Sequence, residues 1–170
     1  MSPKEDISLN RKEQILESAA ALFATQGYYK TTTAHVAEAI GVTQPYVFHF
    51  FKTKEQLYLA VLERAYERME YAFKQVEAAP EKLCEVMGDA FVALLDTHRN
   101  EMLLLMQSSS HSEPGIRQTA KEKYARIYDF AFERFEGAGI PDPAAEARRF
   151  ISYGLMITLS ATLDLPQLMP

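Results

Sequence analysis

The sequence of 170 residues contains no tryptophan and a single cysteine, Cys84. One cysteine cannot form a disulfide within the chain. No run of about 18 apolar residues is present, so the sequence predicts no membrane-spanning helix, and its first residues lack the apolar segment of a signal peptide. Since 48% of the residues are hydrophobic, which is ample for a packed core, we expect a folded cytoplasmic protein without membrane contact.

Catalytic and metal-binding motifs are also missing. The sequence contains no HExxH, no GxxxxGK[ST], no GxSxG and no paired-cysteine spacing. Its histidines are scattered, and none lies at helical spacing from another histidine or from the cysteine. They are His35, His49, His98 and His111. We therefore expect no metal, no cofactor and no enzymatic activity.

The net charge of −5 is unevenly distributed along the chain. Residues 1–54 carry six Lys or Arg against five Asp or Glu, whereas residues 55–170 carry twelve against eighteen. The first part is slightly basic and the second part is acidic, which favours an end-on approach of the first part to a polyanion. Lys30, Lys52 and Lys54 contribute to the basic charge, although such lysines are also common as plain solvated surface.

Residues 32–54, TTAHVAEAIGVTQPYVFHFFKTK, have the pattern of two short helices joined by a tight turn. Gly41 can adopt the left-handed backbone that ends the first helix. Ala37 is small enough for the second helix to pack across it, since a steep helix crossing tolerates only small residues at the contact. The apolar positions left to bury are Val36, Ile40, Val42 and Val47. The pattern predicts a helix-turn-helix, which is a DNA-reading unit.

The flanking segments extend this pattern. RKEQILESAAALFATQGYYKTT leads into VAEAIGV, and TQPYVFHFFKTKEQL follows, with a short recognition helix, an aromatic pair and Lys-Glu opening a long helix. Over about the first third of the chain, the sequence resembles the TetR family of transcriptional regulators. The resemblance implies a DNA-binding domain over residues 9–69, with the helix-turn-helix at about 32–51. A C-terminal helical domain for effector binding and dimerisation is expected over residues 78–170.

The second helix of the motif supplies the candidate DNA contacts. A recognition helix contacts bases mainly with its N-terminal residues, so Thr43, Gln44 and Tyr46 are expected at base edges. The Gln44 side chain can make two hydrogen bonds to adenine. His49 and Lys54 are expected to reach phosphates, Lys54 from the start of a helix, where backbone N–H groups attract anions. The full set of expected DNA-binding residues is Thr32, Thr43, Gln44, Pro45, Tyr46, Phe48, His49 and Lys54.

Three residues depart from the usual pattern of the family. Phe48 stands where a tyrosine usually contacts a phosphate, Pro45 where glycine is common, and Ala34 where a basic residue is frequent. Each departure removes or alters a DNA contact, and the Tyr46 hydroxyl can compensate for the one that Phe48 lacks. The aromatic residues of this segment also fit plain core packing, Phe51 above all.

Helical periodicity continues outside the motif. About ten polar residues at the start are expected to be loose, and a helix is predicted from Arg11 to Gln26, with Gly27 as its C-cap signal. A long helix is predicted from Lys54 to about Gln75, with charges of both signs that are typical of a solvated face. The charged residues are Glu63, Arg64, Glu67, Arg68 and Glu70. In the family that the sequence resembles, this helix transmits movement to the DNA-binding end.

Four further helical segments are predicted after a break at 78–82, with the clearest loop at 108–115. The segments are about 83–98, 101–107, 114–136 and 143–163. The whole pattern predicts an all-α fold of about eight or nine helices with no β-sheet. The resemblance implies that the last two helices meet their copies across a two-fold axis in a homodimer. A hairpin that closes its own core is the alternative.

The C-terminal part has more apolar residues than a structural role clearly needs. Flexible thioethers, aromatic rings and two hydroxyls suit a pocket for a largely apolar or aromatic small molecule. The candidate ligand-binding residues are Met87, Phe91, Leu94, Met102, Met106, Tyr124, Tyr128 and Met156. We expect several of them to line one cavity beneath the long helix, although each of them separately also fits plain core packing.

The expected function is that of a DNA-binding transcriptional regulator. By resemblance, the protein is a homodimeric repressor of a palindromic operator, and a small, largely apolar ligand releases it from the DNA. An activator, or a regulator that responds to a protein, has the same DNA-binding residues. The remaining alternatives are an all-helical adaptor that binds protein without DNA, and an enzyme.

Overall fold

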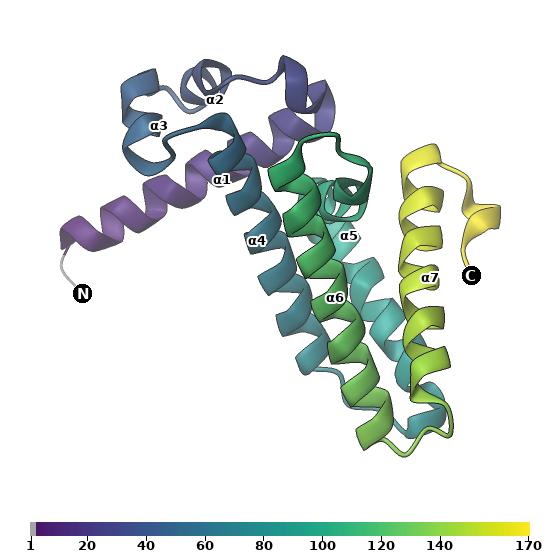
Figure 1. The fold of residues 1–170 in the computed structure, drawn as a ribbon. Helices are drawn as coiled ribbons and strands as arrows, with labels where there is room; N and C mark the ends of the chain where they lie inside the picture. Colours follow the sequence, from purple (N-terminus) through teal and green to yellow (C-terminus); the bar gives the residue numbers. More distant parts are fainter. Residues whose placement is uncertain (1–2) are drawn as a thin grey trace. The chain divides into compact units, whose positions relative to one another are not determined.

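The computed structural model describes the backbone of residues 3–170 and the side chains from residue 9 onward. Within that range every regular element is a helix and no β-strand occurs, which confirms the predicted all-α fold (Figure 1). The α-helices are α1 (Pro3–Lys30), α2 (Thr33–Ala39), α3 (Gln44–Phe50), α4 (Lys54–Lys74), α5 (Leu83–Gln107), α6 (Pro114–Gly137) and α7 (Pro143–Leu163). Short 3-10 helices are η1 (Pro80–Lys82), η2 (Ser108–Ser110) and η3 (Pro166–Leu168). None of these described helices has both the length and the apolar character that crossing a membrane requires.

The chain divides into two compact units, which are described separately. Unit 1 comprises Met1–Arg64 and unit 2 comprises Ala65–Pro170. The division lies within α4, so this helix contributes residues to both units. The sequence placed the end of the DNA-binding domain at residue 69 and the start of the C-terminal domain at residue 78. By their contacts, residues 65–77 belong to unit 2.

Seven α-helices are described in residues 3–170, where eight or nine were predicted. The difference comes from α5, where His98 has φ −135° and ψ 38° but does not end the helix. A second interruption, at Gly27 with φ 80° and ψ 164°, lies within α1. Gly27 lies where the first predicted helix was expected to end. The separate helices predicted before and after His98 form one kinked element, because the apolar pattern buries residues on both sides of the kink.

The N-terminal segment corrects a second prediction. Residues 3–10 belong to α1 and are not loose, while Met1 and Ser2 lie outside the described residues. On the exposed surface of α1, Gln14 Nε2 donates to Asn10 Oδ1 at 2.9 Å, and Arg11 donates to Gln14 Oε1 at 2.8 Å. Polar pairs at spacings of three and four stabilise this polar first part of the helix.

The core of unit 1 forms where α1, α2, α3 and the start of α4 meet. α1 buries most of the apolar face that its periodicity predicted, and Val36 of α2 and Val47 of α3 are fully buried. The rings of Phe23, Tyr28 and Tyr58 pack with centroid separations between 4.9 and 5.9 Å. This core holds the two short helices of the motif in place, although each has only seven residues.

Two arginines of α4 do not lie on a solvated face, contrary to the sequence prediction. Arg64 is 8% exposed and pairs with Glu13 at 2.8 Å and Glu17 at 3.4 Å, all within unit 1. Within unit 2, Arg68 pairs at 2.7 Å with Glu101 of α5, which is 2% exposed. A buried charge persists only beside a partner. The partners lie on other helices, so the charge pattern of α4 alone could not reveal them.

Unit 2 consists of the second part of α4 together with α5, α6 and α7. α7 packs against both α6 and α5, and α6 and α7 run antiparallel from a short turn (Figure 1). Their bounds lie close to the predicted 114–136 and 143–163. Asp142 caps α7, because its side chain accepts a hydrogen bond from Ala145 N at 2.9 Å.

Candidate nucleic-acid interface and ligand cavity

The turn between α2 and α3 has the geometry that the motif predicted. Gly41 has φ +67° and follows Ile40, the C-cap of α2. Gly41 N donates to Glu38 O at 3.1 Å, and Val42 N donates to Ala37 O at 2.9 Å. These bonds satisfy two carbonyls at the end of α2. Ala37 is buried, as expected for the residue across which the second helix packs.

The recognition helix α3 buries one residue and exposes most of the others. Val47 is fully buried and anchors the helix in unit 1. The predicted DNA-binding residues at its start and along it are all exposed: Thr43, Gln44, Pro45, Tyr46, Phe48 and His49. Tyr46 and Phe48 each have 37% of their surface exposed, whereas Phe51 has 6%. Core packing therefore accounts for Phe51 and leaves Tyr46 and Phe48 on the surface.

The two helices of the motif begin differently. Thr32 is the N-cap of α2, and its hydroxyl accepts a hydrogen bond from His35 N at 3.2 Å. Thr43 occupies the N-cap position of α3, but its hydroxyl makes no capping bond. Pro45 has no N–H to offer, and Tyr46 N already donates to Thr43 O at 3.0 Å. The Thr43 hydroxyl therefore stays available for another partner.

The Gln44 side chain is held by a residue of the other helix of the motif. Its Nε2 donates to Thr33 Oγ1 at 2.9 Å, and Thr33 is buried. An amide has two N–H donors and one carbonyl acceptor, so Oε1 and one N–H of Gln44 are left for a base edge. The sequence predicted that Gln44 reads a base but did not predict its hydrogen bond with Thr33.

Lys54 has partners inside unit 1. Its Nζ donates to Tyr28 O at 2.9 Å and to Tyr29 O at 3.4 Å, and it lies 4.3 Å from the centroid of the Tyr28 ring. Lys54 thus joins the start of α4 to the end of α1, where Gly27 leaves backbone carbonyls without the regular helical bonds. An ammonium group has three N–H donors, so one donor remains for a phosphate.

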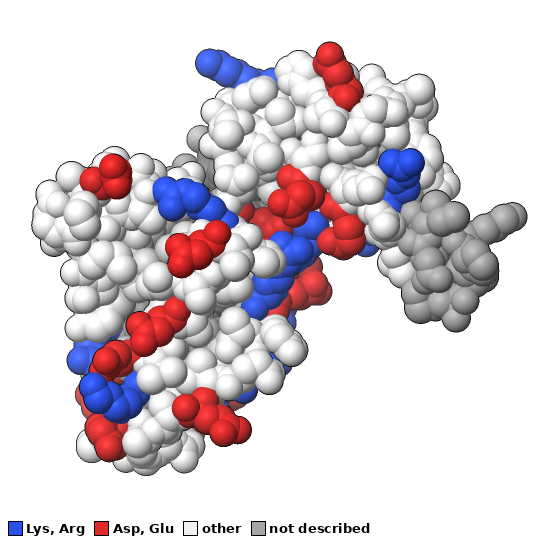
Figure 2. Space-filling view, turned by 180° about the vertical axis from the view of Figure 1, so that it is seen from behind, with Lys and Arg blue, Asp and Glu red and all other residues white. Residues whose placement is uncertain are grey.

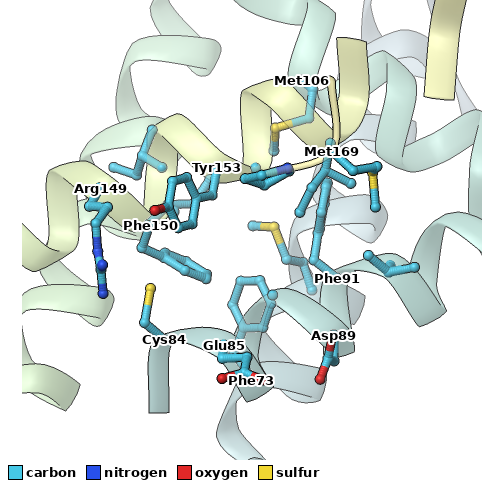
Figure 3. A pocket seen from close by; sticks show the side chains of 18 of the residues that line it. Phe73, Cys84, Glu85, Asp89, Phe91, Met106, Arg149, Phe150, Tyr153 and Met169 are labelled. Carbon is cyan, nitrogen blue, oxygen red and sulfur yellow. The ribbon is translucent and has the colours of Figure 1, made fainter. Parts of the chain in front are cut away.

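Unit 2 contains a cavity of about 450 Å³ that is open to water on one side and is lined mainly by residues of α4, α5, α6 and α7 (Figure 3). Most of its lining is apolar or aromatic: Met69, Phe73, Phe91, Val92, Met106, Ile127, Phe150, Ile151, Ile157 and Met169. In Figure 3 the rings of Phe150 and Tyr153 and the side chain of Phe91 surround the open centre. A cavity of this size and character suits a mainly apolar small molecule.

Three of the eight predicted ligand-binding residues line this cavity, namely Phe91, Met106 and Tyr124. The structure does not bring the other five to it: Met87, Leu94, Met102, Tyr128 and Met156. Met87 and Met102 are fully buried in packing, and Met156 is exposed on α7. The sequence identified the composition of the cavity, but it could not show which side of each helix faces the interior.

Several lining residues were not predicted. Phe73 comes from α4, and Arg149 and Tyr153 come from the first half of α7. Three acidic residues, Glu81, Glu85 and Asp89, also line the cavity. They recur at every fourth residue, which places them on one side of the chain around the start of α5, and this spacing is the signal by which the sequence could have revealed them.

The other polar groups of the cavity wall are already engaged or neutral. The Tyr124 hydroxyl donates to Met106 O at 2.9 Å, and Arg149 forms an ion pair with Glu146. Burial, with the Glu146 carboxylate nearby, raises the pKa of the Cys84 thiol to about 11. Cys84 is therefore a neutral thiol near pH 7, because its pKa lies well above that value.

Charges of both signs are mixed on the surface. Figure 2 shows Lys and Arg interleaved with Asp and Glu, and the face in view has no broad area of one sign. In the part of the chain that the structure describes, no group of three or more His, Cys, Asp or Glu residues is placed to hold a metal ion. The face in view therefore offers individual charged contacts and no continuous polyanion-binding surface.

The helix-turn-helix geometry agrees with a known family model. Residues 15–61 match the model described as bacterial regulatory proteins, tetR family. Residues 15–61 therefore resemble the DNA-binding domain of TetR-family regulators. The chain is 36% identical to the HTH-type transcriptional repressor Rv1474c of Mycobacterium tuberculosis over 89 residues. This aligned segment covers 52% of this chain and 45% of that protein. The chain spans about half the length of the curated relatives it matches, and these TetR-family relatives are named as regulators and not as enzymes.

Solved structures share the TetR-family fold over most of the chain. A TetR transcriptional regulator from Legionella pneumophila superposes with a TM-score of 0.78 at 22% identity, covering 92% of this chain and 90% of that one. AibR, solved with isovaleryl coenzyme A and operator DNA, superposes with a TM-score of 0.68 at 23% identity. The superposition covers 88% of this chain and 86% of the AibR chain. At these identities the likeness shows the fold alone.

Proposed function

We propose that this chain is a TetR-family transcriptional repressor that binds a palindromic operator as a homodimer and is released by a small, largely apolar ligand. The exposed surface of α3 is the observation that carries the proposal. The Thr43 hydroxyl, the Gln44 amide and the Tyr46 hydroxyl are accessible around a single buried anchor, Val47. A helix with such a surface can enter the major groove and read base edges. Such a regulator works in the cytoplasm, where the DNA lies.

The outward faces of α6 and α7 support a dimer in which α7 supplies the central contact. Several apolar residues of α7 are exposed in the single chain: Tyr153, Leu155, Met156, Leu159 and Leu163. The exposed residues of α6 are mostly charged: Arg117, Lys121, Glu122, Arg126, Asp129 and Glu133. An apolar stripe of this kind marks an interaction surface, and a two-fold axis lets the same stripe on two chains meet. The charged residues of α6 suit the solvent-exposed rim of this dimer interface.

The cavity of unit 2 supports the release step. AibR, which has the same fold, was solved with a coenzyme A ester and operator DNA, so the fold can accommodate both kinds of partner. A ligand that releases the protein must bind the DNA-free form better, and DNA must weaken ligand binding by the same factor. A hundredfold effect requires about 2.7 kcal/mol of differential affinity.

Selection of binding sites from random double-stranded DNA tests the proposed function. The purified protein should enrich an inverted repeat whose half-sites lie about 34–36 Å apart, or a multiple of that distance. A protein-binding adaptor, the alternative that the sequence left open, should enrich no DNA. Enrichment of a site without two-fold symmetry would contradict the homodimer.

Filling the cavity tests the release step. Phe91 lines the cavity and Leu94 does not, although both belong to α5. We expect Phe91→Trp to keep operator binding and to lose most of the response to ligands that release the wild-type protein. Leu94→Trp is the matched control and should keep the response. A folded Phe91→Trp protein with a full response would show that the effector binds elsewhere.

A further inference from the structure

We propose that the effector of the unit 2 cavity is a lipophilic cation, an apolar or aromatic molecule that carries one delocalised or shielded positive charge. This inference rests on the proposed function, because it assigns a charge to the ligand that the function requires. The site is the cavity itself, whose lining is mainly apolar. The charged residues at its edge determine which ion it accepts.

Three carboxylates and one guanidinium line the cavity: Glu81, Glu85, Asp89 and Arg149. Three negative charges against one positive charge leave a lining with two excess negative charges. The carboxylate-bearing residues are exposed to water, so they remain ionised without having to be buried. Figure 3 shows Glu85 and Asp89 on one side of the cavity and Arg149 at another edge.

The charges that already have partners leave this imbalance unchanged, because one positive and one negative charge of the lining are each compensated. Arg149 pairs with Glu146, which does not line the cavity, so its positive charge is compensated before any ligand enters. Lys82 pairs with Glu85 at 2.6 Å. Among the side chains that the structure describes, Asp89 has no hydrogen bond and no ion pair. Asp89 therefore offers an uncompensated negative charge at the cavity edge, and Glu81 reinforces it.

The rest of the lining favours a cation over an anion. The Tyr124 hydroxyl donates to Met106 O and is not free to bind an anion. The lining contains the aromatic residues Phe73, Phe91 and Phe150, and the faces of aromatic rings attract cations. The Arg149 guanidinium already lies 5.5 Å from the centroid of the Tyr153 ring, which shows that a cation can lie against this wall.

Two ions of matched shape and opposite charge test the proposal. Tetraphenylphosphonium and tetraphenylborate are similar in size and apolar surface, so any difference in their binding reports charge. Isothermal titration of the full chain should give at least tenfold tighter binding of tetraphenylphosphonium. The difference should shrink as salt is raised, because exposed carboxylates are screened. Tighter or equal binding of tetraphenylborate, or no binding of either ion, would overturn the proposal.

Neutral variants identify the groups responsible. The double variant Glu81→Gln/Asp89→Asn should reduce the preference for tetraphenylphosphonium to less than threefold. Asp96→Asn removes an exposed carboxylate of the same helix that does not line the cavity, and it should keep the full preference. A preference that survives in the double variant would also overturn the proposal, since the charge would then come from elsewhere.

Operator binding of the same preparation separates this inference from the proposed function. A protein that selects a palindromic DNA site but shows no preference for the phosphonium ion is a regulator whose effector is not a cation. A protein that selects no DNA but prefers the phosphonium ion has the cation site without the proposed function. If both results are as expected, tetraphenylphosphonium should also weaken operator binding, and tetraphenylborate should not.

Discussion

At the scale of single residues, the proposed base reading depends on the Gln44 side chain and on the hydrogen bond by which Thr33 holds it. The 2.9 Å bond from Gln44 Nε2 to Thr33 Oγ1 leaves the amide edge that an adenine requires. We expect Gln44→Ala to lower affinity for the selected operator about tenfold, within the range of about 1–3 kcal/mol for a bidentate base contact. Binding to random DNA should be unchanged.

Thr33→Val is the matching test of the positioning role. Valine keeps the shape of threonine but cannot accept the Gln44 hydrogen bond, so the variant should weaken discrimination at the same base by a smaller factor. Fluorescence anisotropy with operators that differ at single base pairs measures both effects. Equal losses on selected and random DNA would show that Gln44 does not read a base.

The two lysines at the start of α4 should have separable effects. Lys54 joins α4 to the carbonyls of Tyr28 and Tyr29, so Lys54→Ala should lower the Tm as well as the affinity for DNA of any sequence. Lys52 is exposed, and Lys52→Ala should weaken DNA binding without changing the Tm. Each phosphate contact that is lost should reduce the salt slope of binding by about one. An unchanged Tm for Lys54→Ala would contradict its structural role.

At the scale of helices, the ion pair between Arg68 of α4 and the buried Glu101 of α5 links two elements of unit 2. Arg68→Met leaves the carboxylate of Glu101 buried without its guanidinium, which should cost about 3 kcal/mol of unfolding free energy. Replacing both residues, as Arg68→Met/Glu101→Leu, should recover most of that loss. Urea denaturation measures both variants.

An exposed ion pair is the control for this prediction. Lys82 and Glu85 pair at 2.6 Å on the surface, and exposed pairs contribute little, so Lys82→Met should leave the urea midpoint almost unchanged. Equal effects of Arg68→Met and Lys82→Met would mean that burial does not strengthen the Arg68 pair.

A sequence determines the features of these helices that depend on neighbouring residues, and it does not determine those that depend on distant ones. Local signals predicted the starts of α6 and α7, because proline restricts the backbone at Pro114 and Pro143. They also predicted the turn at Gly41, because glycine permits the left-handed conformation found there. The partners of Arg64 and Arg68 could not be predicted in this way, since they lie on other helices. The sequence predicted two separate helices around His98 and not one kinked helix, because no proline or glycine marks the kink.

The same limit applies to the candidate sites. The residues proposed to read bases follow one another along a single short helix, so their shared surface could be inferred from the motif. The cavity is assembled from four helices, and its lining depends on the rotation of each helix about its axis. Composition indicated that thioethers and aromatic rings were present, but it could not separate Phe91, which lines the cavity, from Met87, which is packed in the core.

At the scale of the whole molecule, a palindromic operator requires two chains, and the apolar face of α7 is the surface on which we expect them to meet. Leu159 is 43% exposed, so Leu159→Glu should disturb the single chain little and place a charge in the centre of the dimer contact, where burial of an unpaired carboxylate is costly. Light scattering after size exclusion should give the mass of one chain for this variant and of two for the wild type. Operator affinity should fall in parallel, because one recognition helix contacts only half of the site. Ala125→Glu, on the exposed, charged face of α6, is the control and should remain dimeric. A Leu159→Glu protein that stays dimeric at micromolar concentration would place the interface on another surface.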